Sequence, residues 1–237
     1  MQRRHTVDEL ASALECGDRE LVSIVGGGGK TTTLFALGRQ LGGRRVLTTT
    51  TKMGSERDDG VAVLLDPSDD ALGAALDRDP RALVWTDRSG HRADGVAPEA
   101  CDRWFATGVA DHVIVEADGS RRRPFKAPYP YEPVVPDQTT LLVACIGASA
   151  LGGPIAEVCH RSDAVVDIVG GRIEDTLTPA KAAAVLLSDE GSRKSMPDHA
   201  RFVIAVHQVR ASNEAAVLEL VQAVGDRAPI ICVGATA

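Results

Sequence analysis

Short runs of apolar residues recur along the chain, and segments with helical periodicity separate several of them. The apolar runs fall at 20–25, 45–50, 61–65, 82–86, 112–115, 140–146, 202–206 and 229–233. Apolar residues spaced three or four positions apart predict helices at 31–41, 68–76, 98–105, 178–187 and 212–224. Because the apolar runs are continuous rather than alternating, each predicted strand is expected to be buried on both faces. The pattern therefore predicts an α/β fold, with a doubly wound, mostly parallel sheet inside a three-layer sandwich.

The chain has 237 residues, a length between that of one large domain and that of two small ones. We expect residues 1–237 to form a single domain, in which 1–19 is an N-terminal helical extension ahead of the first strand. The segment 120–138 contains five prolines and three consecutive arginines, and it fits neither the helical nor the strand periodicity. Because it directly follows a predicted strand, it is a candidate functional loop.

Charge and composition argue against two classes of partner. The formal net charge of −7 argues against a nucleic-acid binder, because binding to phosphate backbones needs a surplus of basic surface. Residues 139–156 are uncharged, but glycines, a proline and small polar residues interrupt them, so we predict no membrane partner. Five cysteines without a Cys-x-x-Cys pair, and an N-terminus without a continuous apolar stretch, favour a cytoplasmic location.

A run of four glycines followed by Lys30, Thr31 and Thr32 joins the first predicted strand to the first predicted helix. Glycines allow a tight turn whose backbone N–H groups face a phosphate, and the following helix adds its positive N-terminal end. Lys30 is then a catalytic cation on the β- and γ-phosphates, and Thr31 or Thr32 offers a hydroxyl to Mg²⁺. The sequence thus predicts a P-loop NTPase-like domain. The predicted nucleotide-binding residues are Gly26, Gly27, Gly28, Gly29, Lys30, Thr31 and Thr32.

This loop is shorter than the usual eight-residue phosphate-binding pattern. The usual pattern has a glycine six positions before the lysine, where this chain has Ile24. The compact Gly-x-x-Gly-Lys-Thr-Thr loop resembles that of Mur-type amide ligases. The alternative is a glycine-rich strand–helix turn in which Gly-Lys-Thr occurs by chance.

Two carboxylates, Glu116 and Asp118, stand at the end of the apolar run 112–115. Side chains alternate along a strand, so these two are expected on the same face, at the edge where a phosphate-loop sheet holds its metal-binding acid. We predict both as catalytic residues, and both, with Thr31, as candidate Mg²⁺ ligands. The sequence does not decide which carboxylate binds the metal, and an ordinary acidic turn is the alternative.

Four further residues are predicted to contact a second substrate: Thr50, Lys52, Arg121 and Lys126. Thr50 and Lys52 follow the second predicted strand, whereas Thr48 is expected to be structural because threonine favours strands. Arg121, Arg122 and Arg123 form a dense basic cluster with Lys126, and a solvated surface loop is the alternative reading. Cys159 and His160 are expected to be structural, a buried cysteine beside a hydrogen-bonded histidine.

Six segments occur in the chain in a recognisable order: VGGGGKTTT, TTTTKM, VIVEADGSRRRPFKAP, EPVVP, GASALGGPI and CHR. Together they resemble the YqeC family of selenium-cofactor biosynthesis proteins, also described as selenium-dependent hydroxylase accessory proteins, over roughly residues 20–206. The resemblance implies a cytoplasmic P-loop protein that helps to mature molybdenum hydroxylases. Its expected partners are a nucleoside triphosphate and either a molybdenum hydroxylase or a cofactor-maturation protein. The resemblance carries over to Gly26, Gly29, Lys30, Thr31, Thr32, Thr50, Lys52, Glu116, Asp118, Gly119, Ser120 and Lys126.

The late strand lacks the Asn-Lys-x-Asp run with which GTPases read guanine. Arg210 stands where the aspartate is expected, so both ATP and GTP remain candidate nucleotides. Three functions follow as alternatives. They are an Mg²⁺-dependent NTPase that serves cofactor maturation, an ATP-dependent kinase or ligase for a small molecule, and a nucleotide-gated chaperone without chemistry.

Overall fold

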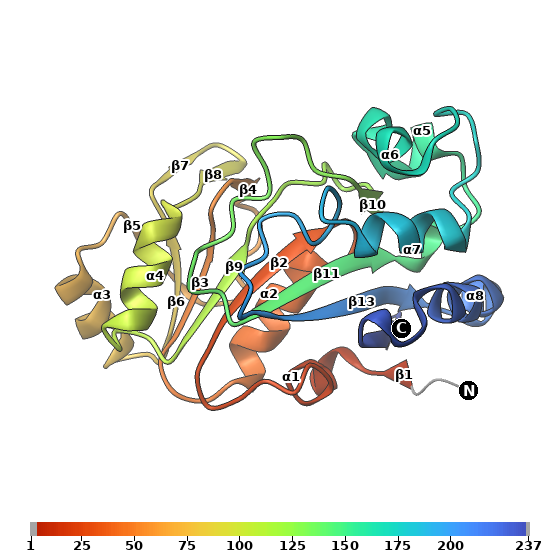
Figure 1. Cartoon of the computed structure of the whole chain (residues 1–237). Coiled ribbons are helices and arrows are strands. Elements are labelled where there is room, and N and C mark those ends of the chain that lie inside the picture. The colour runs from red at the N-terminus through yellow and green to blue at the C-terminus, as the bar shows by residue number, and fades with distance from the viewer. Residues whose placement is uncertain (1–3, 236–237) are drawn as a thin grey trace.

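The computed structural model describes residues 4–235 and is built on a nine-stranded sheet (Figure 1). The strands lie in the order β1-β14-β13-β11-β2-β9-β3-β6-β5, and each pairing between neighbours is parallel. The sheet confirms the predicted α/β class. Its strands are β1 (Arg4–His5), β2 (Glu20–Gly26), β3 (Arg45–Thr49), β5 (Ala62–Leu65), β6 (Arg81–Trp85), β9 (His112–Glu116), β11 (Leu141–Gly147), β13 (Arg201–Val209) and β14 (Ile230–Gly234).

Helices cover both faces of the sheet and make three layers. One face packs against α1 (Leu10–Ala13) and α2 (Lys30–Gln40). The other packs against α3 (Asp69–Leu76), α4 (Pro98–Ala106), α7 (Pro179–Leu187) and α8 (Glu214–Val224). Successive side chains of β2 divide between the two cores: Leu21 and Val25 lie on the α4 and α7 side, and Val22 and Ile24 lie on the α2 side. This division explains why the strands are apolar at consecutive positions.

Local sequence signals set the beginnings of the predicted helices. The Ser68 side chain accepts a hydrogen bond from the backbone N–H of Ala71 at the start of α3. Thr178 caps α7 in the same way, and Pro179 occupies the first helical position, where its missing N–H costs nothing. The long periodic helices therefore lie where the sequence predicts them.

Several short elements were not predicted, and most of them span four residues or fewer, which is too short for a period to be recognised. β4 (Lys52–Gly54), β7 (Asp87–Ser89) and β8 (Arg92–Asp94) form a small antiparallel sheet. The pair β10 (Phe125–Lys126) and β12 (Cys159–His160) is parallel. The others are α5 (Ile155–Val158), α6 (Ser162–Val169), and the 3₁₀ turns η1 (Val7–Glu9), η2 (Ala148–Ala150), η3 (Ala211–Asn213) and η4 (Gly225–Arg227).

The N-terminal extension is helical only in part. Arg4 and His5 form β1 and pair with β14 at the edge of the large sheet, and 3₁₀ turn η1 and the four-residue helix α1 follow. Residues 1–3 of the extension lie outside the described part of the chain. No helix within residues 4–235 combines the length and apolar character needed to cross a bilayer.

Three strand ends meet at one edge of the sheet. β9 lies between β2 and β3, and Glu116, the last residue of β9, is in register with Ile24 on one side and Thr49 on the other. Because all three strands are parallel, their carboxyl ends and the loops that follow them lie together. The glycine-rich loop, the acidic segment and the threonine-rich segment therefore share one edge.

Candidate functional site

The loop of residues 26–32, here called the glycine loop, joins β2 to α2 and makes two very close contacts. A Cβ atom on Gly27 would lie 2.2 Å from the carbonyl oxygen of Pro124. Gly29 has a left-handed φ of 106° at the N-cap of α2, and a Cβ there would lie 2.2 Å from the His207 ring. Side chains at either position would have to displace their neighbours, so this geometry requires glycine at both.

Backbone hydrogen bonds fix the first half of the glycine loop. Gly27 N–H donates to the carbonyl of Cys145 (2.8 Å), and Gly28 N–H donates to that of Pro124 (3.0 Å). The first N–H groups of a helix have no acceptor within the helix, and residues 29–32, where α2 begins, line an open cavity. The second half of the loop therefore presents helix N-terminal amides to the cavity, which is a favourable arrangement for an anion.

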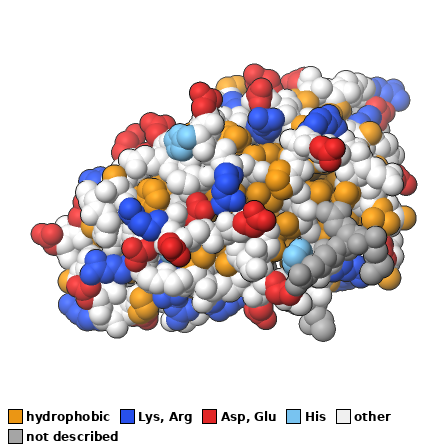
Figure 2. Space-filling view, turned by 60° about the horizontal axis from the view of Figure 1, so that its bottom comes forward, with side chains coloured by type: hydrophobic (Ala, Val, Ile, Leu, Met, Phe, Trp, Pro, Cys, Tyr) orange, Lys and Arg blue, Asp and Glu red, His pale blue; other side chains and the backbone are white. Residues whose placement is uncertain are grey.

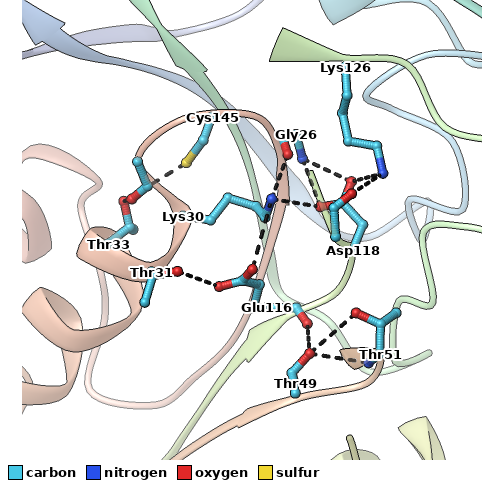
Figure 3. Close-up of polar contacts among 12 residues, drawn as sticks. Gly26, Lys30, Thr31, Thr33, Thr49, Thr51, Glu116, Asp118, Lys126 and Cys145 are labelled. Carbon is cyan, nitrogen blue, oxygen red and sulfur yellow. Dashed lines mark hydrogen bonds and ion pairs between the residues drawn. The ribbon is translucent and has the colours of Figure 1, made fainter. Parts of the chain in front are cut away.

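Lys30 is buried at the centre of the site (Figure 3). Its Nζ donates to the carbonyl of Gly26 (2.6 Å) and lies 3.2 Å from Asp118 Oδ1 and 3.9 Å from Glu116 Oε1. Burial lowers the pKa of Lys30, but the two carboxylates outweigh it, and the net result is a pKa above the ordinary value. Lys30 is therefore a charged ammonium group held by protein acceptors.

Glu116 and Asp118 have different surroundings. Glu116 lines the cavity, and its Oε2 accepts a hydrogen bond from the Thr31 hydroxyl (2.9 Å). Burial raises the pKa of Glu116 above its ordinary value, although Lys30 and the hydrogen bond from Thr31 oppose the shift. Asp118 is outside the cavity lining, and both of its oxygens accept from the N–H of Gly26 (3.2 and 3.0 Å). The tertiary structure thus separates two carboxylates that the sequence leaves equivalent.

The Thr31–Glu116 pair suits a magnesium ion. Mg²⁺ prefers oxygen ligands, keeps several waters, and usually takes one or two carboxylates together with phosphate oxygens. A threonine hydroxyl next to a carboxylate, at the mouth of the glycine loop, offers this type of donor. Asp118 is already engaged with the Gly26 amide and the Lys30 ammonium group, so Glu116 is the more available ligand.

A chain of buried charges leads away from Lys30. Asp118 Oδ2 lies 3.2 Å from the ammonium group of Lys126, which in turn donates to Glu132 Oε2 (2.8 Å). Glu132 Oε1 lies 2.5 Å from Arg161 Nε. Lys126 is buried and lies outside the cavity lining. The charges alternate in sign along this series of ion pairs, so Asp118, Lys126 and Glu132 each lie between two groups of opposite charge.

The threonine-rich segment is mostly committed to the backbone. Thr48 donates to the carbonyl of Val84 and is buried, in line with a structural role. Thr49 donates to the carbonyl of Glu116 (2.7 Å), and Thr50 donates to that of Val134 (2.6 Å). Lys52 lines the cavity and lies 2.9 Å from Asp94. Of the two residues predicted here to contact substrate, only Lys52 reaches the cavity, and Thr50 supports the loop beside it.

The cavity has a volume of about 960 Å³. Besides the glycine loop and Glu116, the lining includes Arg121, which was predicted, and His160, which was expected to be structural. It also includes four residues for which no role was predicted: Tyr131, Glu132, Arg161 and Gln208. The pairing of β10 with β12 brings His160 and Arg161 there, a contact between segments far apart in the sequence. Gln208 lies near the end of β13, within the stretch that replaces the guanine-reading run, and Arg210 is not among the lining residues.

A family model described as "YqeC protein" matches residues 22–163, which is more than half of the chain. The chain belongs to the YqeC family. It is also 33% identical over 228 residues to a protein of Escherichia coli (strain K12) called "Uncharacterized protein YqeC", covering 91% of this chain and 88% of that relative. The resemblance to the YqeC family is thereby confirmed.

The YqeC match extends over most of the candidate site. The glycine loop, Glu116, Asp118, the buried charges and His160–Arg161 all fall within residues 22–163. His207 and Gln208 lie beyond the matched segment. The YqeC family model thus covers the residues that form the glycine-loop side of the cavity.

Proposed function

We propose that this YqeC-family protein binds a nucleoside triphosphate with Mg²⁺ and hydrolyses or transfers its γ-phosphate. The observation that supports it best is the convergence of Lys30, Thr31 and Glu116 at a glycine loop that opens a helix. The three groups correspond to a cation for the phosphates, a hydroxyl for the metal and a carboxylate to complete its shell. The metal would neutralise negative charge on the phosphate oxygens.

Each residue then has a defined task. The amides of residues 29–32 bind the phosphates, and Lys30 exchanges the Gly26 carbonyl for phosphate oxygens. Thr31 and Glu116 would hold Mg²⁺, since the hydroxyl of Thr31 donates to Glu116 Oε2 beside the glycine loop. Asp118 keeps Lys30 charged and oriented, and so acts as a positioning residue.

In the cell we propose an accessory role in selenium-cofactor biosynthesis or in the maturation of molybdenum hydroxylases. This step rests on the family alone, and a molybdenum hydroxylase or a cofactor-maturation protein is the proposed partner. A second candidate function is an ATP-dependent kinase or ligase for a small molecule. It is favoured by the basic side chains that line the cavity beyond the glycine loop, among them Arg121 and Arg161.

Isothermal titration with non-hydrolysable ATP and GTP analogues, each with and without Mg²⁺, tests the proposal. We expect Mg²⁺-dependent binding that Lys30→Ala weakens at least tenfold. Lys181→Ala is the matched control, since Lys181 pairs with Asp175 away from the cavity lining. Binding that Lys30→Ala leaves unchanged would refute the phosphate role of the loop. A tenfold preference for one analogue, about 1.4 kcal/mol, would decide between ATP and GTP.

A further inference from the structure

The cavity holds more positive charge than a phosphate loop requires. Its lining contains eight Lys or Arg residues but three Asp or Glu residues, in a chain whose net charge is −7. By contrast, Figure 2 shows acidic and basic side chains interspersed over the face of the molecule that it displays. A local excess of one sign attracts a ligand of the opposite sign.

Most of this excess lies outside the glycine loop. Lys30 is the cation that belongs to the loop, while Lys52, Arg57 and Arg122 each have a carboxylate partner: Asp94, Asp59 and Glu56, respectively. Arg121 and Arg123 have no carboxylate within ion-pair distance in the described part of the chain, and both are exposed to the cavity. Their charge is available to a ligand.

Arg121 and Arg123 affect the pKa values of residues in β12, of which His160 lines the cavity. The pKa of His160 is lowered first by burial and then by the positive charges of Lys126, Arg161 and Arg121. Burial raises the pKa of the neighbouring Cys159 thiol to about 12, and Arg123 opposes that shift. The pairing of β10 with β12, which matches Phe125 with Cys159 and Lys126 with His160, places the loop that carries these arginines beside β12.

Arg161 is held rigidly beside them. Its guanidinium carbon lies 3.8 Å from the centre of the Tyr129 ring and 5.3 Å from that of Tyr131, and its Nε pairs with Glu132. Tyr129 is itself fixed by a 2.6 Å hydrogen bond from its hydroxyl to Asp163. A guanidinium group fixed in this way loses little freedom when its other N–H groups bind an anion.

We propose that Arg121, Arg123, His160 and Arg161, here called the arginine wall, form a second ligand subsite that binds a phosphate or other multiply charged anionic group. This inference rests on the proposed nucleotide binding, and it names the substrate class of the same cavity: a small anionic molecule that binds together with the nucleotide. A volume of about 960 Å³ is at the upper end of the ~300–1,000 Å³ typical of ligand pockets, so both ligands have room.

The test uses inorganic pyrophosphate as the probe, without Mg²⁺, in isothermal titration. Wild-type protein should bind two pyrophosphates, one at the glycine loop and one at the arginine wall. The double variant Arg121→Ala/Arg123→Ala should keep one site, and Lys30→Ala should keep the other with affinity within threefold of wild type. Arg78→Ala/Arg172→Ala removes the same charge outside the cavity lining and should keep both sites.

Nucleotide binding distinguishes the failure of this inference from that of the proposed function. The Arg121→Ala/Arg123→Ala protein should bind the triphosphate analogue within threefold of wild type. A tenfold loss would show that these arginines hold the nucleotide, and would overturn the second subsite. The second subsite would also be overturned if wild-type protein bound a single pyrophosphate and the Arg121→Ala/Arg123→Ala protein still bound it. This outcome does not depend on whether Lys30→Ala folds. Failure of the analogue to bind wild-type protein would instead overturn the proposed function.

Discussion

The ammonium group of Lys30 lies 3.2 Å from the carboxylate of Asp118, and both side chains are almost fully buried. Asp118 is shared with a second lysine, Lys126, and with the amide of Gly26. A bound triphosphate would compete with Asp118 and the Gly26 carbonyl for Lys30. Asp118 would then keep Lys126 and the Gly26 amide as partners, so its charge would not be left isolated when Lys30 moves.

This relationship predicts different outcomes for two conservative substitutions. Glu116→Gln should weaken the Mg²⁺ dependence of nucleotide binding about tenfold or more, because it removes a charged oxygen beside Thr31. Asp118→Asn should instead destabilise the fold by roughly 3–5 kcal/mol, because two buried ammonium groups lose their shared carboxylate. Titration with Mg²⁺ and denaturant unfolding measure the two effects. Equal Mg²⁺ dependence in both variants would contradict the distinction.

The Lys126–Glu132 pair should show strong coupling in a double-mutant cycle. Removing either partner alone leaves a buried charge and should cost roughly 3–5 kcal/mol, whereas Lys126→Met/Glu132→Gln should cost less than the sum. Urea unfolding of the four proteins gives the coupling energy. The exposed pair Arg44 and Asp77 is the control cycle, in which about 0.2–1 kcal/mol is expected. Additive effects at the buried pair would show that it is not an interacting unit.

Gly27→Ala should destabilise the protein and abolish triphosphate binding. The added Cβ would meet the carbonyl oxygen of Pro124 at 2.2 Å, and overpacking of this kind costs roughly 1–3 kcal/mol. Gly73→Ala, within α3 and with no atom within 4 Å of the new Cβ, should stabilise by roughly 0.5–1 kcal/mol. Thermal unfolding and analogue titration of both variants check this contrast. Normal binding by Gly27→Ala would mean that the loop does not require its close approach to Pro124.

His207 should make the fold sensitive to acid. Burial lowers its pKa from 6.5 to about 4, so the neutral ring that hydrogen-bonds Thr33 persists in the folded state while the unfolded chain takes up a proton. Its contribution is therefore fully present above pH 6.5 and is lost as the pH falls towards 4, by up to about 3 kcal/mol.

Unfolding of wild-type protein and His207→Gln, measured between pH 7 and 4, checks the role of His207. Wild-type protein should lose more stability over this interval than the variant, because only the wild type has this buried imidazole. The exposed His199 provides the control substitution, His199→Gln, which should follow the wild-type profile. Identical pH profiles for wild-type protein and His207→Gln would contradict a buried neutral ring.

The sequence alone predicted most strands of the sheet, its long helices and the two strand ends that lie beside the cavity. Continuous apolar runs specify strands buried on both faces, and the helical period specifies helices such as α2 and α8, so these elements follow from local patterns. The glycine loop was also predictable because it joins a strand to a helix, and Glu116 was predictable because it ends a strand. The roles given to Lys30, Thr31, Glu116 and Asp118 stay predictions until nucleotide and metal binding are measured.

Only the tertiary structure decided which side chains meet across long separations in the sequence. It distinguished Glu116, which lines the cavity, from Asp118, which holds Lys30 and Lys126 behind the loop. It also brought His160 and Arg161 to the cavity through the pairing of β10 with β12. The spacing of apolar residues in a segment depends on how that segment is buried, whereas these contacts depend on how separate segments pack against each other. Two-residue strands such as β10 and β12 are also too short to show such a spacing.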